Sequence, residues 1–249
     1  GTIGDITNTG VINGSGTGVS YGYGINNKSG TKIGNITNTG VIYGKDNAIK
    51  NNSGTIATAK NYGILVNGDD GKGVVDGLDI DTSAGENKIV NKGLIFKAVG
   101  GNYKVEKDEY GKFGATFDND AGIKIINAKA EGTEDNITGT ESLKLENGIL
   151  TYGDSQKEKI SSGKGYILNG ITDTLKVTKK HNELNDSIIN AYKTAIVMEG
   201  DSTYLELNNT IVNGGLDDNS PVILTKGNGN FLTIKGDTIV NGEIKSEGS

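Results

Sequence analysis

Short apolar triplets alternate with small polar residues along most of this chain, and the pattern repeats. Residues 1–12 return as residues 30–42 at an offset of 30, and a looser copy runs over residues 89–95. Near the other end, residues 209–214 match residues 237–242 at an offset of 28. The chain is therefore built from a degenerate internal repeat, which is the signature of a solenoid.

The repeat predicts short β-strands joined by tight corners. A triplet is too short for a helix, and no window keeps apolar residues at helical spacing. The β-branched residues Ile, Val and Thr favour strands, whereas Asn and Gly favour the turn conformations that a corner needs. Three strands and three corners make one coil of a parallel β-helix, and each coil stacks on the previous one at about 4.8 Å. We therefore predict an all-β, three-sided solenoid of about nine coils, with residues 1–249 as a single segment.

Stacking also predicts where particular residues lie. Ile12 over Ile42 and Val11 against Val41 should form ladders, with Ile and Val in the core and Asn along some corners. The single proline, Pro221, should occupy a corner, because a β-helix uses nearly every backbone N–H in its ladders. The chain does not begin with Met and carries no pattern for a capping helix. We expect it to be a fragment of a longer protein.

The regularity breaks in five places, which we interpret as loops or hairpins that protrude from the solenoid. Residues 101–114 alternate apolar or aromatic with charged positions, a pattern typical of a hairpin. Insertions in solenoids often gather on the binding face, so we expect this arm to contact a partner. The alternative is that each insertion is a tolerated surface excursion. The insertions lie near residues 66–87, 100–117, 131–141, 151–165 and 172–187. The expected partner-binding residues are Tyr103, Lys104, Lys107, Asp108, Tyr110 and Phe113.

Two other groups of residues have both a binding and a structural interpretation. Residues 69–87 concentrate acidic side chains among glycines, as a calcium loop does, but the ligand order of an EF-hand is not met. We favour a solvated loop there and expect no metal and no cofactor. Tyr residues that alternate with Gly could stack on sugars, although packing along the sheet surface is the preferred interpretation. These residues are Tyr21, Tyr23, Tyr43 and Tyr62.

Composition removes several function classes. The 249 residues include 40 Gly, no Cys, one His and a net charge of -6, and every basic residue is Lys. The lack of Cys excludes disulfides, thiolate zinc sites and a Cys nucleophile, and His181 alone cannot build a histidine metal centre. We interpret His181 as an exposed loop residue. An acidic chain without Arg disfavours nucleic acid as a partner, and no apolar run is long enough to cross a membrane as a helix.

The Asn-x-Gly-x-Ile units at residues 8–12, 38–42 and 91–95, and the Asn-Thr-Ile-Val-Asn-Gly motif at residues 209–214, resemble passenger regions of bacterial type Va autotransporters. Among these, the chain is most similar to the large adhesins of AT-rich bacteria that mediate coaggregation and host-cell attachment. The excess of Lys, Asn and Ile over Arg is similar too. The resemblance implies a right-handed β-helix, type V secretion, a role in virulence and display on the cell surface. It also implies an outer-membrane anchor formed by a C-terminal barrel, which we expect outside this segment.

We therefore expect a non-enzymatic adhesin segment that binds a receptor, protein or glycan, on a host cell or another bacterium. Two alternatives stay open. One is a β-helical polysaccharide lyase or hydrolase, for which Asp69-Asp70 and Asp217-Asp218 supply paired acids. The Gly-His-Gly and Arg-based motifs of such enzymes do not occur, however. The other is a structural spacer that holds a distal binding tip away from the cell.

Overall fold

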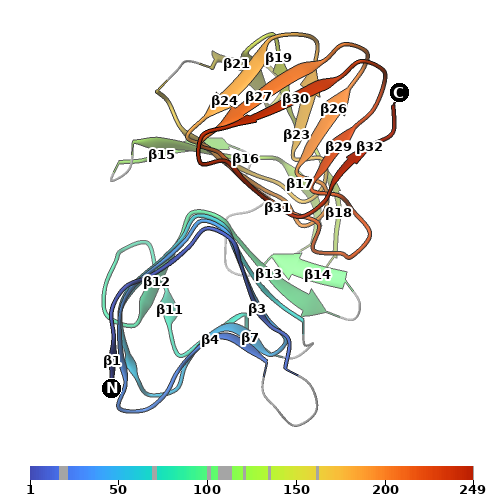
Figure 1. The fold of residues 1–249 in the computed structure, drawn as a ribbon. Coiled ribbons are helices and arrows are strands. Elements are labelled where there is room, and N and C mark those ends of the chain that lie inside the picture. The colour runs from blue at the N-terminus through green and yellow to red at the C-terminus, as the bar shows by residue number, and fades with distance from the viewer. Residues whose placement is uncertain are drawn as a thin grey trace. The chain divides into compact units, whose positions relative to one another are not determined.

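The computed structural model describes residues 1–16, 22–68, 72–99, 102–105, 114–119, 122–133, 136–160 and 163–248. Within these ranges the chain forms strands and turns without any helix (Figure 1). Parallel strands stack as a β-solenoid of about eight turns, so the predicted right-handed parallel β-helix is confirmed. The expected nine coils were slightly too many, because some residues counted as coils belong to insertions. One connection, from Asn127 to Asn169, spans 42 residues.

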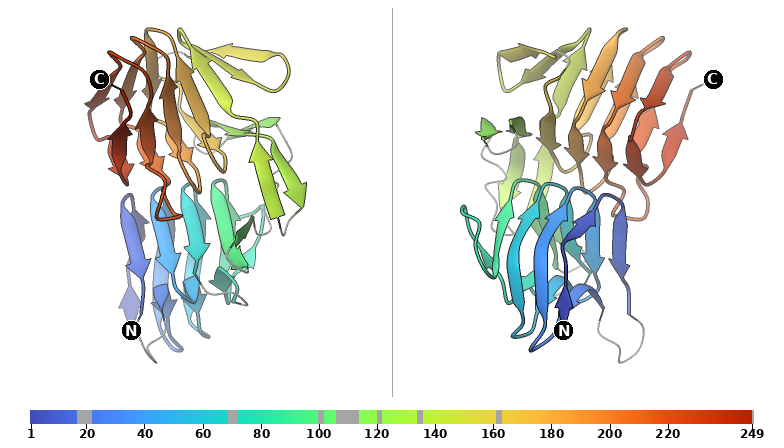
Figure 2. Two further views of the ribbon diagram at one scale, coloured as in Figure 1. Left: turned by 90° about the vertical axis from the view of Figure 1, so that its right-hand side faces the viewer. Right: turned by 60° about the vertical axis from the view of Figure 1, so that its left-hand side comes forward.

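The chain divides into two compact units, whereas the repeat led us to expect one segment over residues 1–249. Unit 1 comprises Gly1–Asp108 and Gly132–Ile137, and unit 2 comprises Glu109–Glu131 and Thr138–Ser249. Each unit has its own cluster of buried apolar residues. In both units the strands of successive coils lie side by side (Figure 2).

Unit 1 has three sheets, whose neighbouring strands are parallel except where β14 runs antiparallel to β13. The first sheet contains β1 (Thr2–Ile3), β2 (Ile6–Asn8), β5 (Lys32–Asn38), β8 (Thr55–Asn61), β11 (Asp79–Ile80) and β12 (Lys88–Asn91). The second contains β3 (Val11–Gly14), β6 (Val41–Gly44), β9 (Ile64–Asn67), β13 (Leu94–Val99) and β14 (Asn102–Val105). The third contains β4 (Tyr23–Asn27), β7 (Asn47–Asn51) and β10 (Val75–Asp76).

The register confirms the predicted ladders of unit 1. Ile12 pairs with Ile42, which pairs in turn with Leu65 on the next coil. Ile42 and Leu65 are fully buried and belong to the core of the unit. Val11 pairs with Val41 on the neighbouring positions of the same strands, and these valines are not part of the core cluster. Alternation along the strand thus sends one ladder inward and the other to the opposite face.

The repeated Asn-x-Gly motif forms the corner between the first and second sheets of unit 1. The Nδ2 group of Asn8 donates to Oδ1 of Asn38 at 2.8 Å, Asn38 donates to Asn61 at 2.7 Å, and Asn61 donates to Asn91 at 2.8 Å. Each of these side chains also donates to the carbonyl of the glycine two residues later. The ladder satisfies buried amides that would otherwise cost free energy, which explains why Asn recurs there.

The glycine of the same motif is required by close approach of the coils. A Cβ added to Gly63 would lie 2.1 Å from the carbonyl oxygen of Gly40, and one added to Gly40 would lie 2.1 Å from that of Gly10. These distances are shorter than any real Cβ contact, so a larger residue would push the coils apart. At Gly10, on the first coil, an added Cβ would meet no atom within 4 Å.

Unit 2 also has three stacked sheets. The first contains β15 (Gly114–Asp118), β16 (Ile123–Asn127), β22 (Tyr166–Asn169), β25 (Ile188–Asn190), β28 (Ile211–Asn213) and β31 (Ile239–Asn241). The second contains β19 (Leu143–Glu146), β20 (Ile149–Tyr152), β21 (Gln156–Lys159), β23 (Leu175–Thr178), β26 (Ile196–Glu199), β29 (Ile223–Thr225) and β32 (Ile244–Ser246). The third contains β24 (Asn182–Asn185), β27 (Tyr204–Asn208) and β30 (Phe231–Lys235). A separate two-stranded sheet, which belongs to neither unit alone, pairs β17 (Ala130–Thr133) with β18 (Asn136–Thr140).

Apolar ladders and a second asparagine ladder hold the coils of unit 2 together. Leu168 and Ile189 pair on successive coils and are fully buried in the core of the unit. At the following corner, Asn190 donates to Oδ1 of Asn169 at 2.9 Å and Asn213 donates to Asn190 at 2.9 Å. Pro221 lies in the irregular connection between β28 and β29, as expected of a corner.

Some of the predicted insertions are present in the structure, and one is not. Residues 131–141 contribute to the β17–β18 sheet, and residues 151–165 contain β21, which is antiparallel to β20. The prediction for residues 172–187 was wrong, because β23 and β24 pair in parallel with β26 and β27 as regular coil strands. The basic run that suggested an insertion is only the corner between them, where Lys179 and His181 have positive φ of 62° and 61°. His181 is exposed, as predicted.

Candidate functional site

The residues expected to bind a partner lie mostly outside the described part of the chain. Four of these residues lie outside the described ranges: Lys107, Asp108, Tyr110 and Phe113. Tyr103 and Lys104 are in β14, where they pair with Ala98 and Lys97 of β13. The first strand of the predicted hairpin therefore exists, but its described partner is the preceding strand. The binding role of this arm stays a prediction.

The paired acids of the enzyme alternative do not form a described catalytic pair. Asp69 and Asp70 lie outside the described residues. Asp217 accepts hydrogen bonds from the backbone N–H and the hydroxyl of Ser220, at 3.0 and 2.9 Å, so it stabilises a turn. Within residues 72–87, the carboxylate of Asp81 pairs with Lys88 at 2.6 Å, which lowers the pKa of Asp81. Among the described residues, no group of three or more His, Asp or Glu side chains could hold a metal ion.

Polar side chains gather instead in unit 2, where β19, β20 and β21 form an antiparallel meander. Asn147 and Gly148 connect β19 to β20 as a two-residue turn, and their φ angles are +51° and +72°. Positive φ at both positions is what this tight hairpin turn requires, and Asn-Gly is its preferred sequence. β19 is also parallel to β23, so the meander extends the sheet of the regular coils.

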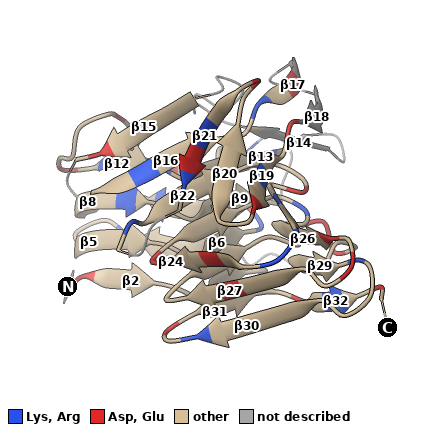
Figure 3. Cartoon of the chain, turned by 90° about the horizontal axis from the view of Figure 1, so that it is seen from above, with Lys and Arg blue, Asp and Glu red and all other residues tan. Residues whose placement is uncertain are grey.

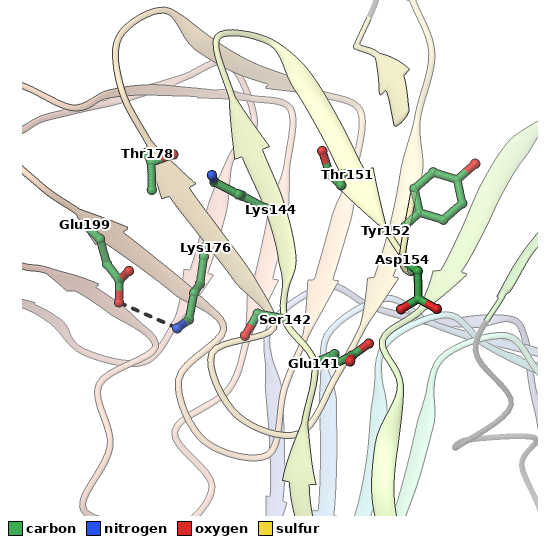
Figure 4. Close-up of a pocket in the computed structure, with 10 residues that line it drawn as sticks. Glu141, Ser142, Lys144, Thr151, Tyr152, Asp154, Lys176, Thr178 and Glu199 are labelled. Carbon is green, nitrogen blue, oxygen red and sulfur yellow. Dashed lines mark ion pairs between the residues drawn. The ribbon is translucent and has the colours of Figure 1, made fainter. Parts of the chain in front are cut away.

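The meander and the adjoining coil strands enclose a polar pocket of about 520 Å³ (Figure 4). A smaller pocket of about 400 Å³ shares Glu141, Gly153 and Asp154 with it. We call the two pockets together the groove. The first pocket is lined by Glu141, Ser142, Lys144, Thr151, Tyr152, Gly153, Asp154, Lys176, Thr178 and Glu199. The second adds Lys129, Ser155 and Gln156.

The two ends of the groove differ in charge. At one end Lys176 and Glu199 form an ion pair at 3.8 Å, drawn as a dashed line in Figure 4. The carboxyl groups of Glu141 and Asp154 lie together at the other end of the pocket in Figure 4. Neither carboxylate has an ion-pair partner among the described residues. The hydroxyl of Thr178 is buried and has no hydrogen-bond partner within the described part of the chain. The groove thus offers carboxylate acceptors and the ammonium group of Lys176 to a polar ligand.

A charge cluster lies on the other side of β20, and Tyr152 connects it to the groove. The carboxylate of Glu158 contacts the ammonium groups of both Lys124 and Lys164 and accepts a hydrogen bond from Tyr166 at 3.0 Å. The ammonium of Lys124 also donates to the Tyr152 hydroxyl at 3.1 Å. In Figure 3, β16 and β21 both carry charged residues.

Burial and hydrogen bonding compete in this cluster. Burial alone would raise the pKa of Glu158, but the hydrogen bonds from Lys124, Lys164 and Tyr166 outweigh it, and the pKa is lowered. Burial would lower the pKa of Lys124, and the contacts with Glu158 and Tyr152 reverse this. Burial and the hydrogen bond to Glu158 both raise the pKa of Tyr166. These contacts favour the charged forms of Lys124 and Glu158 and the neutral form of Tyr166.

No protein-family model, no curated protein and no solved structure matches this chain. The described residues also include no helix with the length and apolar character needed to span a membrane. The fold and the groove thus define the class that the structure supports, a β-helix with a polar groove built from an insertion.

Sequence reasoning placed an insertion near residues 151–165 but missed the groove. The Asn147-Gly148 turn between apolar alternating segments was the available signal, because such a turn indicates a hairpin. Lys144, Lys176 and Glu199 carry no comparable signal. They come from three separate strands, and only the parallel pairing of those strands brings them together.

Proposed function

We propose that this chain is an attachment segment of a surface-displayed, autotransporter-like passenger, and that the groove of unit 2 contacts a polar receptor group such as a glycan. The observation that carries the proposal is the meander of β19, β20 and β21. It departs from the regular stack and builds a pocket of about 520 Å³ on the sheet. A solenoid that served only as a spacer has no need of such a pocket.

The chemistry of the groove suits a ligand rich in hydroxyl groups. The Glu141 and Asp154 carboxylates accept hydrogen bonds, and the Lys176 ammonium donates them. Hydrogen bonds to charged groups contribute about 1.5–3 kcal/mol each when water is displaced. Adjacent sugar hydroxyls can donate to a carboxylate and accept from an ammonium at the same time. The charged residues of the pocket could therefore orient a bound sugar as well as contribute to its affinity.

The test is attachment by the purified chain, measured as retention on host cells, on bacterial cells and on a glycan array. The double variant Glu141→Gln/Asp154→Asn keeps side-chain size and removes two charges. We expect retention to fall about tenfold, which corresponds to about 1.4 kcal/mol. The matched control is Asp237→Asn/Glu243→Gln, which removes the same charges from exposed positions of the last coil. Equal retention by the two double variants would move the attachment site away from the groove.

A second candidate function rests on the same two carboxylates. Two carboxyl groups at one end of a pocket can act as general acid and general base in glycoside hydrolysis. The measurement that separates the two functions is the appearance of new reducing ends when the chain is incubated with the glycans of the array. Turnover without retention, abolished in the Glu141→Gln/Asp154→Asn variant, would favour a hydrolase over an attachment segment.

A further inference from the structure

An exposed aromatic ring lies against two ammonium groups in unit 2. Phe117 of β15 is 56% exposed, and its backbone pairs with Lys124 of β16. The Nζ atoms of Lys124 and Lys164 lie 5.5 and 5.6 Å from the centre of the Phe117 ring. The exposed ring and the two ammonium groups therefore offer a ligand an apolar face and a positive charge at one place.

The charge beside this ring is positive. Among the described residues, the carboxylate in contact with Lys124 and Lys164 is that of Glu158, so two ammonium groups face one carboxylate. The surplus positive charge stands out in a chain whose net charge is -6. The side chain of Lys124 is only 11% exposed, whereas that of Lys164 is 33% exposed and can be reached from solvent.

The contacts also hold these groups in place before any ligand arrives. Lys124 is fixed by Glu158 and by the Tyr152 hydroxyl at 3.1 Å. Lys124 lies two residues before Ile126, and Tyr166 lies two residues before Leu168, so both share the strand face that carries the apolar core. A preorganised site loses less conformational entropy on binding than a flexible surface lysine does.

We propose that Phe117, Lys124 and Lys164 bind an acidic sugar residue of a glycan, with its carboxylate at Lys164 and its C–H face on the Phe117 ring. This inference rests on the proposed attachment function and adds a second subsite, which shares only Tyr152 with the groove. The electron-rich face of an aromatic ring attracts C–H groups, and an ammonium group forms a strong, charge-assisted hydrogen bond with a carboxylate. One flat ring beside one surplus charge matches one carboxylate per sugar ring. An acidic peptide offers charges without the flat apolar face.

The test uses three immobilised polymers: polygalacturonate, its fully methyl-esterified form, and polyglutamate. We expect the full chain to bind polygalacturonate, to bind the ester at least about tenfold more weakly, and to lose affinity as salt is raised. Phe117→Ala and Lys164→Gln should each weaken binding to polygalacturonate at least about fivefold. The matched controls Phe231→Ala and Lys235→Gln alter exposed residues of β30 and should stay within about twofold of the unmodified chain.

Three results would overturn the inference: equal binding to polygalacturonate and its ester, stronger binding to polyglutamate, or unchanged binding by Phe117→Ala. Circular dichroism of each variant checks that the fold is intact, and Phe117→Ala tests the site even if Lys164→Gln unfolds. The cell-retention assay keeps the two proposals separate. Retention that depends on Glu141 and Asp154 without any binding to polygalacturonate would leave the attachment function standing and remove this subsite.

Discussion

The charge cluster around Glu158 allows a sharp test of the structure of unit 2 through the substitution Glu158→Gln. This change keeps the size of the side chain and removes the carboxylate that, among the described residues, contacts Lys124 and Lys164. The two ammonium groups then face each other without a described counter-charge, at side-chain exposures of 11% and 33%. Breaking one side of a fully buried ion pair costs about 3–5 kcal/mol. Because solvent reaches Lys164, we expect a loss of about 2 kcal/mol in the free energy of unfolding of unit 2.

The pH dependence of this loss follows from the lowered pKa of Glu158. A carboxyl group whose pKa is lower in the folded state stabilises the fold above its unfolded pKa of about 4.3, and this stabilisation is lost as the pH falls through the folded value. In the unmodified chain at low pH, the protonated Glu158 leaves the lysines as unpaired as the Gln variant does. The difference in stability between the two chains should therefore be full at pH 7, begin to shrink as the pH falls below the unfolded pKa of about 4.3, and disappear once the pH is below the lowered pKa of folded Glu158.

The assay is urea unfolding followed by the fluorescence of the 10 Tyr residues, since the chain has no Trp. Hydrogen exchange of peptides that cover residues 143–169 assigns the loss to unit 2. Glu243→Gln, at an exposed position, is the matched control and should change stability by less than about 0.5 kcal/mol. A loss for Glu158→Gln equal to that of this control at pH 7, or a stability difference from the unmodified chain that widens as the pH falls, would show that Glu158 does not stabilise unit 2 through the two lysines.

Two further predictions concern the repeated motif of unit 1. Gly63→Ala should lower the free energy of unfolding by about 2 kcal/mol or more, because its Cβ would lie 2.1 Å from the Gly40 carbonyl oxygen. The control Gly10→Ala should be nearly neutral, because its Cβ would meet no atom within 4 Å. Equal melting temperatures for the two variants would show that the coils are spaced differently. Asn61→Ala should lower the free energy of unfolding by about 3 kcal/mol, because the buried Asn61 amide forms hydrogen bonds with both neighbouring coils. In the same urea titration, the control Asn26→Ala, at an exposed position, should lower it by less than about 0.5 kcal/mol. A small loss for Asn61→Ala would refute the ladder.

The corner motif explains why the regular part of the fold was predictable. Asn38 is needed because its side-chain amide forms a hydrogen bond with the next coil. Gly40 is needed because the backbone of the preceding coil leaves no space for a Cβ. Every coil of the stack imposes these requirements again, so they appear as a repeat in the sequence. The apolar ladder through Ile42 and Leu65 follows from the same register. Fold class, core residues and the stacking of Ile12 on Ile42 were therefore readable from the residues alone.

The candidate site was less predictable because its residues meet by long-range pairing. The step from Asn38 to Asn61 is 23 residues, that from Asn61 to Asn91 is 30, and that from Asn127 to Asn169 is 42. Such variable spacing hides which segments are coils and which are insertions. Segment 172–187 is an example: its charged corner suggested an insertion, but the segment contains two coil strands. The buried apolar residues of these strands are Leu175, Val177 and Leu184.

The amino-acid sequence by itself determined that the chain forms short strands, turns at Asn and Gly, and stacks its coils in parallel, because each of these properties depends on neighbouring residues or on identical neighbours one coil away. Only the tertiary structure decided that the chain divides into two units, that β20 and β21 fold back as a meander, and that Glu158 lies between Lys124 and Lys164. Those features depend on which distant strands pair. The free energy of that pairing comes from burial summed over many residues and is not encoded in any short segment.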